Sequence, residues 1–209
     1  MSSRSRILTK KSDKMPTVIY IKAVKDTNLL LLGISEGEET KRYTVSEPLY
    51  ASIGSPRRND TVSYEALAEV YRFDEYYRAK RKALSLLSYS DKNERELARK
   101  LSLSGFSREV SREVSREMVS LGYVDESRQL ERIILAEANV KLYGYAKIRT
   151  RLLARGYSAA DVKRVTGELV GRGEISFNKN AHLLVEKRLP EGATLEEKKK
   201  LLYKNGYKV

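Results

Sequence analysis

The sequence predicts a mainly α-helical fold, in which tandem three-helix repeats form an elongated, curved body behind a small N-terminal α+β unit. Three observations lead to this prediction. Strand patterns are confined to the first 61 residues, helical patterns fill the rest, and one helix–turn pattern returns after 51 residues. Tandem helical units of this kind stack side by side, because a single unit cannot bury its apolar face alone.

The N-terminal part of the chain divides into a tail and the α+β unit. Residues 1–16 are basic and serine-rich without an apolar run, which indicates a disordered tail rather than a signal peptide. Within residues 17–72, the runs TVIYIKAV, LLLLGIS and KRYTVS are separated by KDTN and EGEE, an order typical of a three-stranded meander. A short helix is expected over EPLYASI. A longer helix is expected from Tyr64, with Ser63 as its N-cap and a break near Phe73.

The helical part is predicted to hold two full repeats and a truncated third, over residues 73–124, 125–175 and 176–209. Leu97 and Leu101 in the first repeat correspond to Ile148 and Leu152 in the second, and each pair has the spacing of a buried helical ridge. A glycine suited to ending a helix follows each ridge, and a serine then follows to cap the next helix. These residues are Gly105, Gly156, Gly206, Ser107 and Ser158. Helices are expected at about 64–88, 91–103, 107–121, 125–143, 145–154, 158–172, 176–188 and 194–205.

Composition argues against several functional classes. The chain of 209 residues has no cysteine, which excludes disulfides, thiol catalysis and thiolate metal sites, and it suits a reducing, cytoplasmic location. No apolar run approaches the ~20 residues of a membrane span, so no membrane association is expected. The single histidine, His182, has no partner pattern, and the chain has no phosphate-loop motif and no metal-ligand spacing. We therefore expect no enzymatic activity, no catalytic residues, no metal and no cofactor.

The net charge of +13 points to an anionic partner, with nucleic acid first and an acidic protein surface second. Lys147, Arg151 and Arg155 lie four residues apart and predict a basic stripe on the helix at 145–154, flanked by Arg149. Like charges at this spacing weaken a helix by a few tenths of a kcal/mol per pair, which an acidic or phosphate partner would offset. The first repeat has Glu96, Lys100 and Ser104 instead, so repeat geometry does not require the charge. Further basic contacts are predicted at Lys100, Lys163, Arg164, Arg81 and Lys82.

The stretch SREVSREVSREM has a period of four. Val110, Val114 and Met118 are predicted to form a buried ridge, while arginines and glutamates of opposite charge alternate outside it. This pattern favours a balanced surface helix, with a second contact line as the alternative. Tyr143, Tyr145 and Tyr157 lie near the basic stripe and are expected to be packing residues rather than base-stacking platforms.

Four motifs, in order, resemble the RecX family of bacterial regulatory proteins. They are ALSLL (83–87), RELARKLSLSGF (95–106), LGYVD (121–125) and YGYAKIRTRLLARG (143–156), and the match extends over residues 83–175. The N-terminal unit is similar to an extension of Gram-positive members. Two features depart from the family pattern. Gln129-Leu130 stands where Phe-Ala is usual, and the third repeat is short.

The resemblance implies a monomeric, non-enzymatic modulator of the RecA recombinase. Such proteins bind in the groove of the RecA filament on single-stranded DNA and block its growth or promote its disassembly. Recombination, DNA repair and the SOS response would be modulated in this way. RecA and single-stranded DNA are then the expected partners, with double-stranded DNA as a further candidate. The residues alone leave a second hypothesis open, in which a RecA-independent, basic helical protein grips nucleic-acid phosphates directly.

Overall fold

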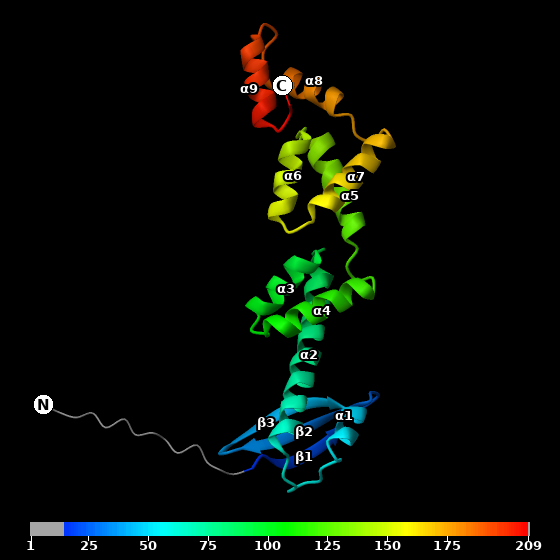
Figure 1. Ribbon diagram of the computed structural model, residues 1–209, viewed down its shortest axis with the longest axis vertical. Coiled ribbons are helices and arrows are strands. Elements are labelled where there is room, and N and C mark those ends of the chain that lie inside the picture. The colour runs from blue at the N-terminus through cyan, green and yellow to red at the C-terminus, as the bar shows by residue number, and fades with distance from the viewer. Residues whose placement is uncertain (1–14, 209) are drawn as a thin grey trace, which may run out of the picture. The chain divides into compact units, whose positions relative to one another are not determined.

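The computed structural model describes residues 15–208, so the tail expected at residues 1–16 lies almost entirely outside the described part (Figure 1). The chain forms two compact units that divide between Arg81 and Lys82. The first holds a three-stranded antiparallel sheet and the second is entirely helical in its described residues. The predicted fold class, mainly helical with a small N-terminal α+β unit, is therefore confirmed.

The sheet of the first unit is the predicted meander. Strands β1 (Thr17–Ala23), β2 (Leu29–Glu36) and β3 (Glu39–Ser46) pair in sequence order. The register shifts between Val18 and Tyr20, and the Tyr20 ring covers Gly33 so closely that a β-carbon there would overlap it. The short helix α1 (Glu47–Ser52) follows β3, as expected.

Helix α2 (Tyr64–Tyr89) covers the sheet with its first turns, which contribute Leu67 and Val70 to the core of the first unit. Ser63 caps the helix by accepting a hydrogen bond of 3.1 Å from the Ala66 amide, as predicted. The break expected near Phe73 is wrong, because α2 contains no proline or glycine and Asp74 anchors it to the sheet. The Asp74 carboxylate accepts a 2.9 Å hydrogen bond from the Thr44 amide and pairs with Arg78. The repeat boundary expected between residues 72 and 73 consequently falls inside a continuous helix.

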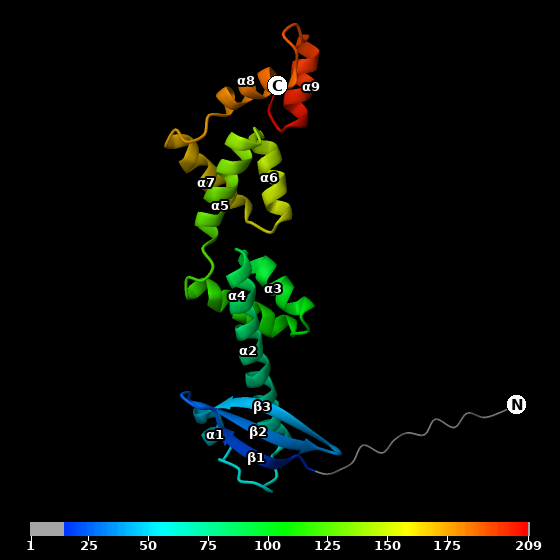
Figure 2. The same ribbon diagram turned by 180° about the vertical axis from the view of Figure 1, so that it is seen from behind.

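The second unit begins with the end of α2. Helices α3 (Glu94–Leu103) and α4 (Arg108–Ser120) come next, and α5 (Glu126–Leu135) continues into a π-helical turn, Ala136–Val140. Helices α6 (Tyr145–Ala154) and α7 (Ala159–Gly171) pack with α5 around one core, as Figure 2 shows. The truncated repeat consists of α8 (Phe177–Arg188) and α9 (Leu195–Lys204).

The repeat pattern places its residues as predicted. Leu97, Leu101, Ile148 and Leu152 are all fully buried. Gly105, Gly156 and Gly206 follow their helices with φ angles of 94°, 100° and 85°, in the left-handed region. The side chains of Ser107 and Ser158 cap α4 and α7. The local pattern therefore sets where these helices end and which face each one buries.

Candidate functional site

Lys147 and Arg151 of the predicted basic stripe, and the flanking Arg149, lie on α6, and Arg155 is its C-cap. Arg149, Arg151 and Arg155 are exposed, whereas Lys147 is partly buried. The stripe residues differ in what they contact, and this difference decides which of their charges are available to a partner.

Arg151 forms an ion pair with an acid of the protein itself. Its Nε donates hydrogen bonds of 2.9 and 3.2 Å to the two carboxylate oxygens of Glu137, a residue of the π-helical turn that is only 4% exposed. The Lys141 ammonium lies 3.5 Å from the same carboxylate. The hydrogen bond to Glu137 raises the pKa of Arg151. An acid of the chain itself thus supplies the compensation that like charges four residues apart require.

Lys147 is also engaged. Its ammonium lies 4.0 Å from the centroid of the Tyr143 ring and donates a 3.0 Å hydrogen bond to the side-chain oxygen of Asn205. The Arg151 guanidinium lies 5.6 Å from the same ring. The Tyr143 ring packs on the helical core and receives both cations on its face, an arrangement that stabilises the fold.

Asn205 belongs to a loop that caps α6. Gly144, at the helix N-terminus, has no side chain to serve as a cap. The amides of Gly144 and Ala146 instead donate hydrogen bonds of 2.8 and 3.2 Å to the carbonyls of Asn205 and Gly206. Because these are the amides that helix geometry leaves unpaired, the truncated third repeat satisfies the first turn of α6.

A similar contact joins the first and second repeats. The side-chain nitrogen Nδ2 of Asn93, the N-cap of α3, donates a 2.9 Å hydrogen bond to the Arg155 carbonyl at the end of α6. Buried Gln129 strengthens this junction, since it donates to the Lys92 carbonyl at 3.2 Å and accepts from the Tyr157 hydroxyl at 3.2 Å. Gln129 is one of the residues that depart from the family pattern, and it serves here as a polar link between repeats.

The expectation for the three tyrosines is confirmed. Tyr157 is 5% exposed and part of the helical core, and burial raises the pKa of its hydroxyl. Tyr145 meets Phe177 edge-on with a centroid distance of 6.5 Å. Together with Tyr143, these rings pack within the unit.

The other predicted basic residues are spread over three helices. Arg164 on α7 pairs with Asp161 at 3.4 Å and with Glu168 at 3.1 Å, so its charge is compensated. Lys163 on α7 is exposed, and Lys100 on α3 is half-buried. Arg81 and Lys82 are exposed on α2, where they fall on either side of the division between the two units.

Two grooves contain arginines that the sequence prediction did not select. One, of about 340 Å³, lies between α3 and the end of α6 and is lined by Arg95, Glu96, Arg99, Ala154 and Arg155. The other, of about 350 Å³, lies between α3 and α4 and is lined by Ala98, Arg99, Ser102, Leu103, Arg108 and Arg112. Arg108 and Arg112 belong to the SREV pattern, whose alternating charges concealed them.

On α4, the helix that carries the SREV pattern, the arginines are only partly compensated by acids. Val110, Val114 and Met118 are buried as predicted, and Arg116 lies 3.7 Å from Glu94. Arg108 and Arg112 make no ion pair with any residue from 15 to 208. The alternative of a second contact line is therefore retained for the N-terminal half of α4.

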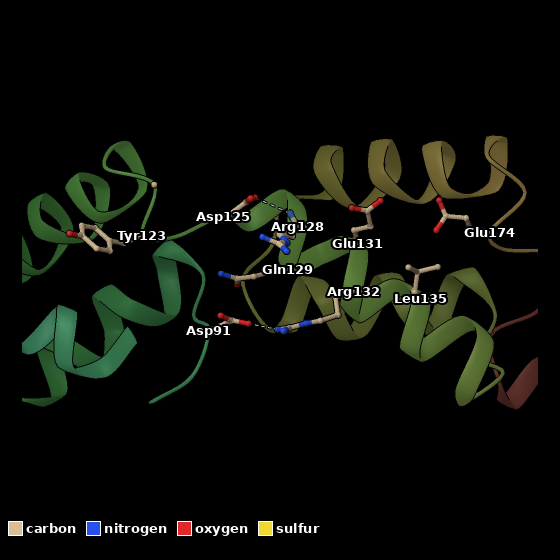
Figure 3. A pocket seen from close by; sticks show the side chains of 10 residues that line it. Asp91, Tyr123, Asp125, Arg128, Gln129, Glu131, Arg132, Leu135 and Glu174 are labelled. Carbon is tan, nitrogen blue, oxygen red and sulfur yellow. Dashed lines mark hydrogen bonds and ion pairs between the residues drawn. The ribbon is translucent and has the colours of Figure 1, made fainter. Parts of the chain in front are cut away.

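A pocket of about 550 Å³ in the second unit is lined mainly by polar and charged side chains (Figure 3). Its acids are largely paired, because Asp91 binds Arg132 and Arg172 binds both Glu131 and Glu174. Among residues 15–208, no group of three or more His, Asp or Glu side chains could hold a metal ion. In the same range, no helix is both long and apolar enough to span a bilayer.

The architecture and composition define the class of this protein as a basic helical-repeat protein with a small α+β unit. The family model for the first three-helix domain of RecX matches residues 79–114. A relative from Clostridioides difficile (strain 630), "Regulatory protein RecX", is 28% identical over 148 residues, which cover 71% of this chain and 68% of the relative.

Solved structures share the fold. A crystal structure of regulatory protein RecX matches with a TM-score of 0.67 and 16% identity, over 93% of this chain and 95% of that one. RecX from Lactobacillus salivarius matches with a TM-score of 0.54 and 16% identity, over 65% of this chain and 90% of that one. With the sequence matches, these findings confirm the resemblance to the RecX family of regulatory proteins that the motifs indicated.

Proposed function

We propose that this protein regulates a RecA-type recombinase by binding the RecA filament on single-stranded DNA, blocking its growth or promoting its disassembly, without catalysing a reaction. The resemblance to the RecX family carries the proposal. The uncompensated cations of the second unit support it, because both RecA-bound DNA and acidic protein surfaces attract such charges.

The basic residues proposed to contact the filament are those whose charges are not compensated by contacts within the fold. Arg149, Arg155 and Lys163 are exposed and make no ion pair with any described residue. Lys147 and Arg151 instead fix the Tyr143 ring, the Asn205 loop and Glu137. A test that reverses Arg151 would leave Glu137 facing a second carboxylate, so it would probe folding rather than binding.

The experiment is single-strand-dependent ATP hydrolysis by RecA of the same organism, at near-physiological salt and with DNA in excess. Excess DNA removes the effect of simple competition for the strand. We expect inhibition at amounts well below one protein per RecA. A protein that binds bare DNA under these conditions but leaves ATP hydrolysis unchanged would refute the proposal and favour a RecA-independent nucleic-acid binder.

Charge reversal tests the surface. The variant Arg149→Glu with Arg155→Glu is expected to lose inhibition while it keeps its helical circular-dichroism signal. Lys187→Glu with Arg188→Glu on α8 is the matched control, since both residues are exposed and the change in net charge is the same. Equal inhibition by the two double variants would remove the α6 surface from the mechanism.

A further inference from the structure

The groove between α3 and α4 concentrates positive charge. Among residues 15–208, its lining holds three arginines, namely Arg99, Arg108 and Arg112, and no acid. All three side chains are exposed, and none pairs with a carboxylate within residues 15–208. By contrast, Arg116, one turn further along α4, lies 3.7 Å from Glu94.

The placement of these arginines is electrostatically unfavourable for the free protein. Arg108 is the first residue of α4, at the end where the helix dipole favours acids and disfavours cations. Arg112 lies four residues further on, so the two like charges face each other along the helix. A bound anion would relieve both effects, and it would also lie near the N-terminus of a 13-residue helix.

The repeat supplies an internal comparison. With the offset of 51 residues, Arg99 corresponds to Thr150, Arg108 to Ala159 and Arg112 to Lys163. The second repeat forms the same pair of helices with one cation instead of three. The fold therefore does not require the arginines of the first repeat.

A second groove shares one of these arginines. Arg99 lines the groove between α3 and α6 as well, together with Arg95, Arg155 and one acid, Glu96. Arginines thus follow one another across α3 from the end of α6 to the start of α4. A row of planar, multiply donating guanidinium groups matches a chain of repeating phosphates better than one isolated carboxylate.

We propose that the groove between α3 and α4 binds backbone phosphates of a single-stranded nucleic acid, with Arg99, Arg108 and Arg112 as the contacting residues. Leu103 at its edge is 71% exposed and offers an apolar contact to a base. This inference deepens the proposed function. It rests on that function only in assuming that the single strand bound in the groove is the DNA of the RecA filament. The groove itself is tested on bare DNA.

The probe is a dye-labelled oligothymidylate long enough to cover the helical repeats, and its anisotropy is measured over a series of salt concentrations. Arg99→Gln, Arg108→Gln and Arg112→Gln are combined in one variant. Each phosphate contact contributes about 0.7 to the magnitude of the slope of log affinity against log salt concentration. If each arginine contacts one phosphate, the slope should therefore fall in magnitude by about 2. The affinity near physiological salt should fall by roughly tenfold or more, since hydrogen bonds to charged groups are lost.

The matched control combines Lys179→Gln, Lys187→Gln and Arg188→Gln on α8, which removes the same charge from exposed positions. We expect its affinity to change by no more than about threefold, because remote exposed charges are screened by salt. A third variant replaces the three arginines with lysine and should recover most of the salt slope. Unchanged urea midpoints confirm that all three variants fold.

Equal affinity and slope in the groove and control variants would overturn the proposal. So would a groove variant that loses binding to polyglutamate while it binds the oligothymidylate normally, because the groove would then receive an acidic protein segment. Loss of DNA binding in the groove variant, together with a wild-type protein that does not inhibit RecA, would support the groove and refute the proposed function. The two proposals can therefore fail separately.

Discussion

The pair formed by Arg151 and Glu137 should have an asymmetric effect on stability. Arg151→Ala leaves the Glu137 side chain, which is 5% exposed, with only the Lys141 ammonium at 3.5 Å. Removing one partner of a buried ion pair costs about 3–5 kcal/mol. Because Arg151 is 48% exposed and Lys141 remains, we expect a smaller loss of about 2–3 kcal/mol. Glu137→Ala should cost about 1–2 kcal/mol, since the freed arginine can be hydrated.

Urea unfolding followed by far-UV circular dichroism measures these losses, and native-state hydrogen exchange of the α6 amides assigns them to the second unit. Arg149→Ala is the control, because this exposed neighbour makes no ion pair with any described residue, and it should change stability by no more than about 0.5 kcal/mol. The double variant should lose about 1–2 kcal/mol less than the sum of the single losses. An Arg151→Ala protein as stable as the Arg149→Ala protein would refute the interpretation that Arg151 serves the fold.

Three further perturbations test other contacts. Gln129→Leu leaves the buried Tyr157 hydroxyl without its acceptor and should cost about 1–3 kcal/mol in urea unfolding, and no loss would mean that this link between repeats is dispensable. Gly206→Ala adds a β-carbon that overlaps the Lys147 backbone, so the Gly144 and Ala146 amides should exchange faster, whereas Gly192→Ala, in open space, should leave them protected. Burial alone would raise the pKa of Glu36, but hydrogen bonds from Tyr43, Tyr71 and Lys41 outweigh it and lower the pKa. The stability that Glu36 contributes is fully present above its unfolded-state pKa near 4.5, and it is lost as the pH falls through the lower folded-state pKa. Glu36→Gln should therefore make the free energy of unfolding depend less on pH in this acidic range.

Local sequence signals specify the helices of this protein and the faces that these helices bury. The four-residue spacing of Ile148 and Leu152, the glycine after each ridge and the serine after that glycine are local signals, and local backbone geometry obeys them. The break expected near Phe73 failed because Asp74 bonds to a strand 30 residues earlier in the chain. No local pattern contains that contact.

Packing between helices sets which charges on this surface are compensated within the fold. Lys147 and Arg151 look like an open stripe in the sequence, but Asn205 lies 58 residues from Lys147 and Glu137 reaches Arg151 from a π-helical turn. Conversely, Arg108 and Arg112 look balanced by the glutamates beside them. Packing of α3 against α4 nevertheless places them with Arg99 along a groove that no acid from residues 15–208 lines. The spacing along one helix fixes which direction a side chain takes, whereas charge compensation depends on which helices meet. That is why the sequence predicted a basic surface, while the fold selected the residues that can form it.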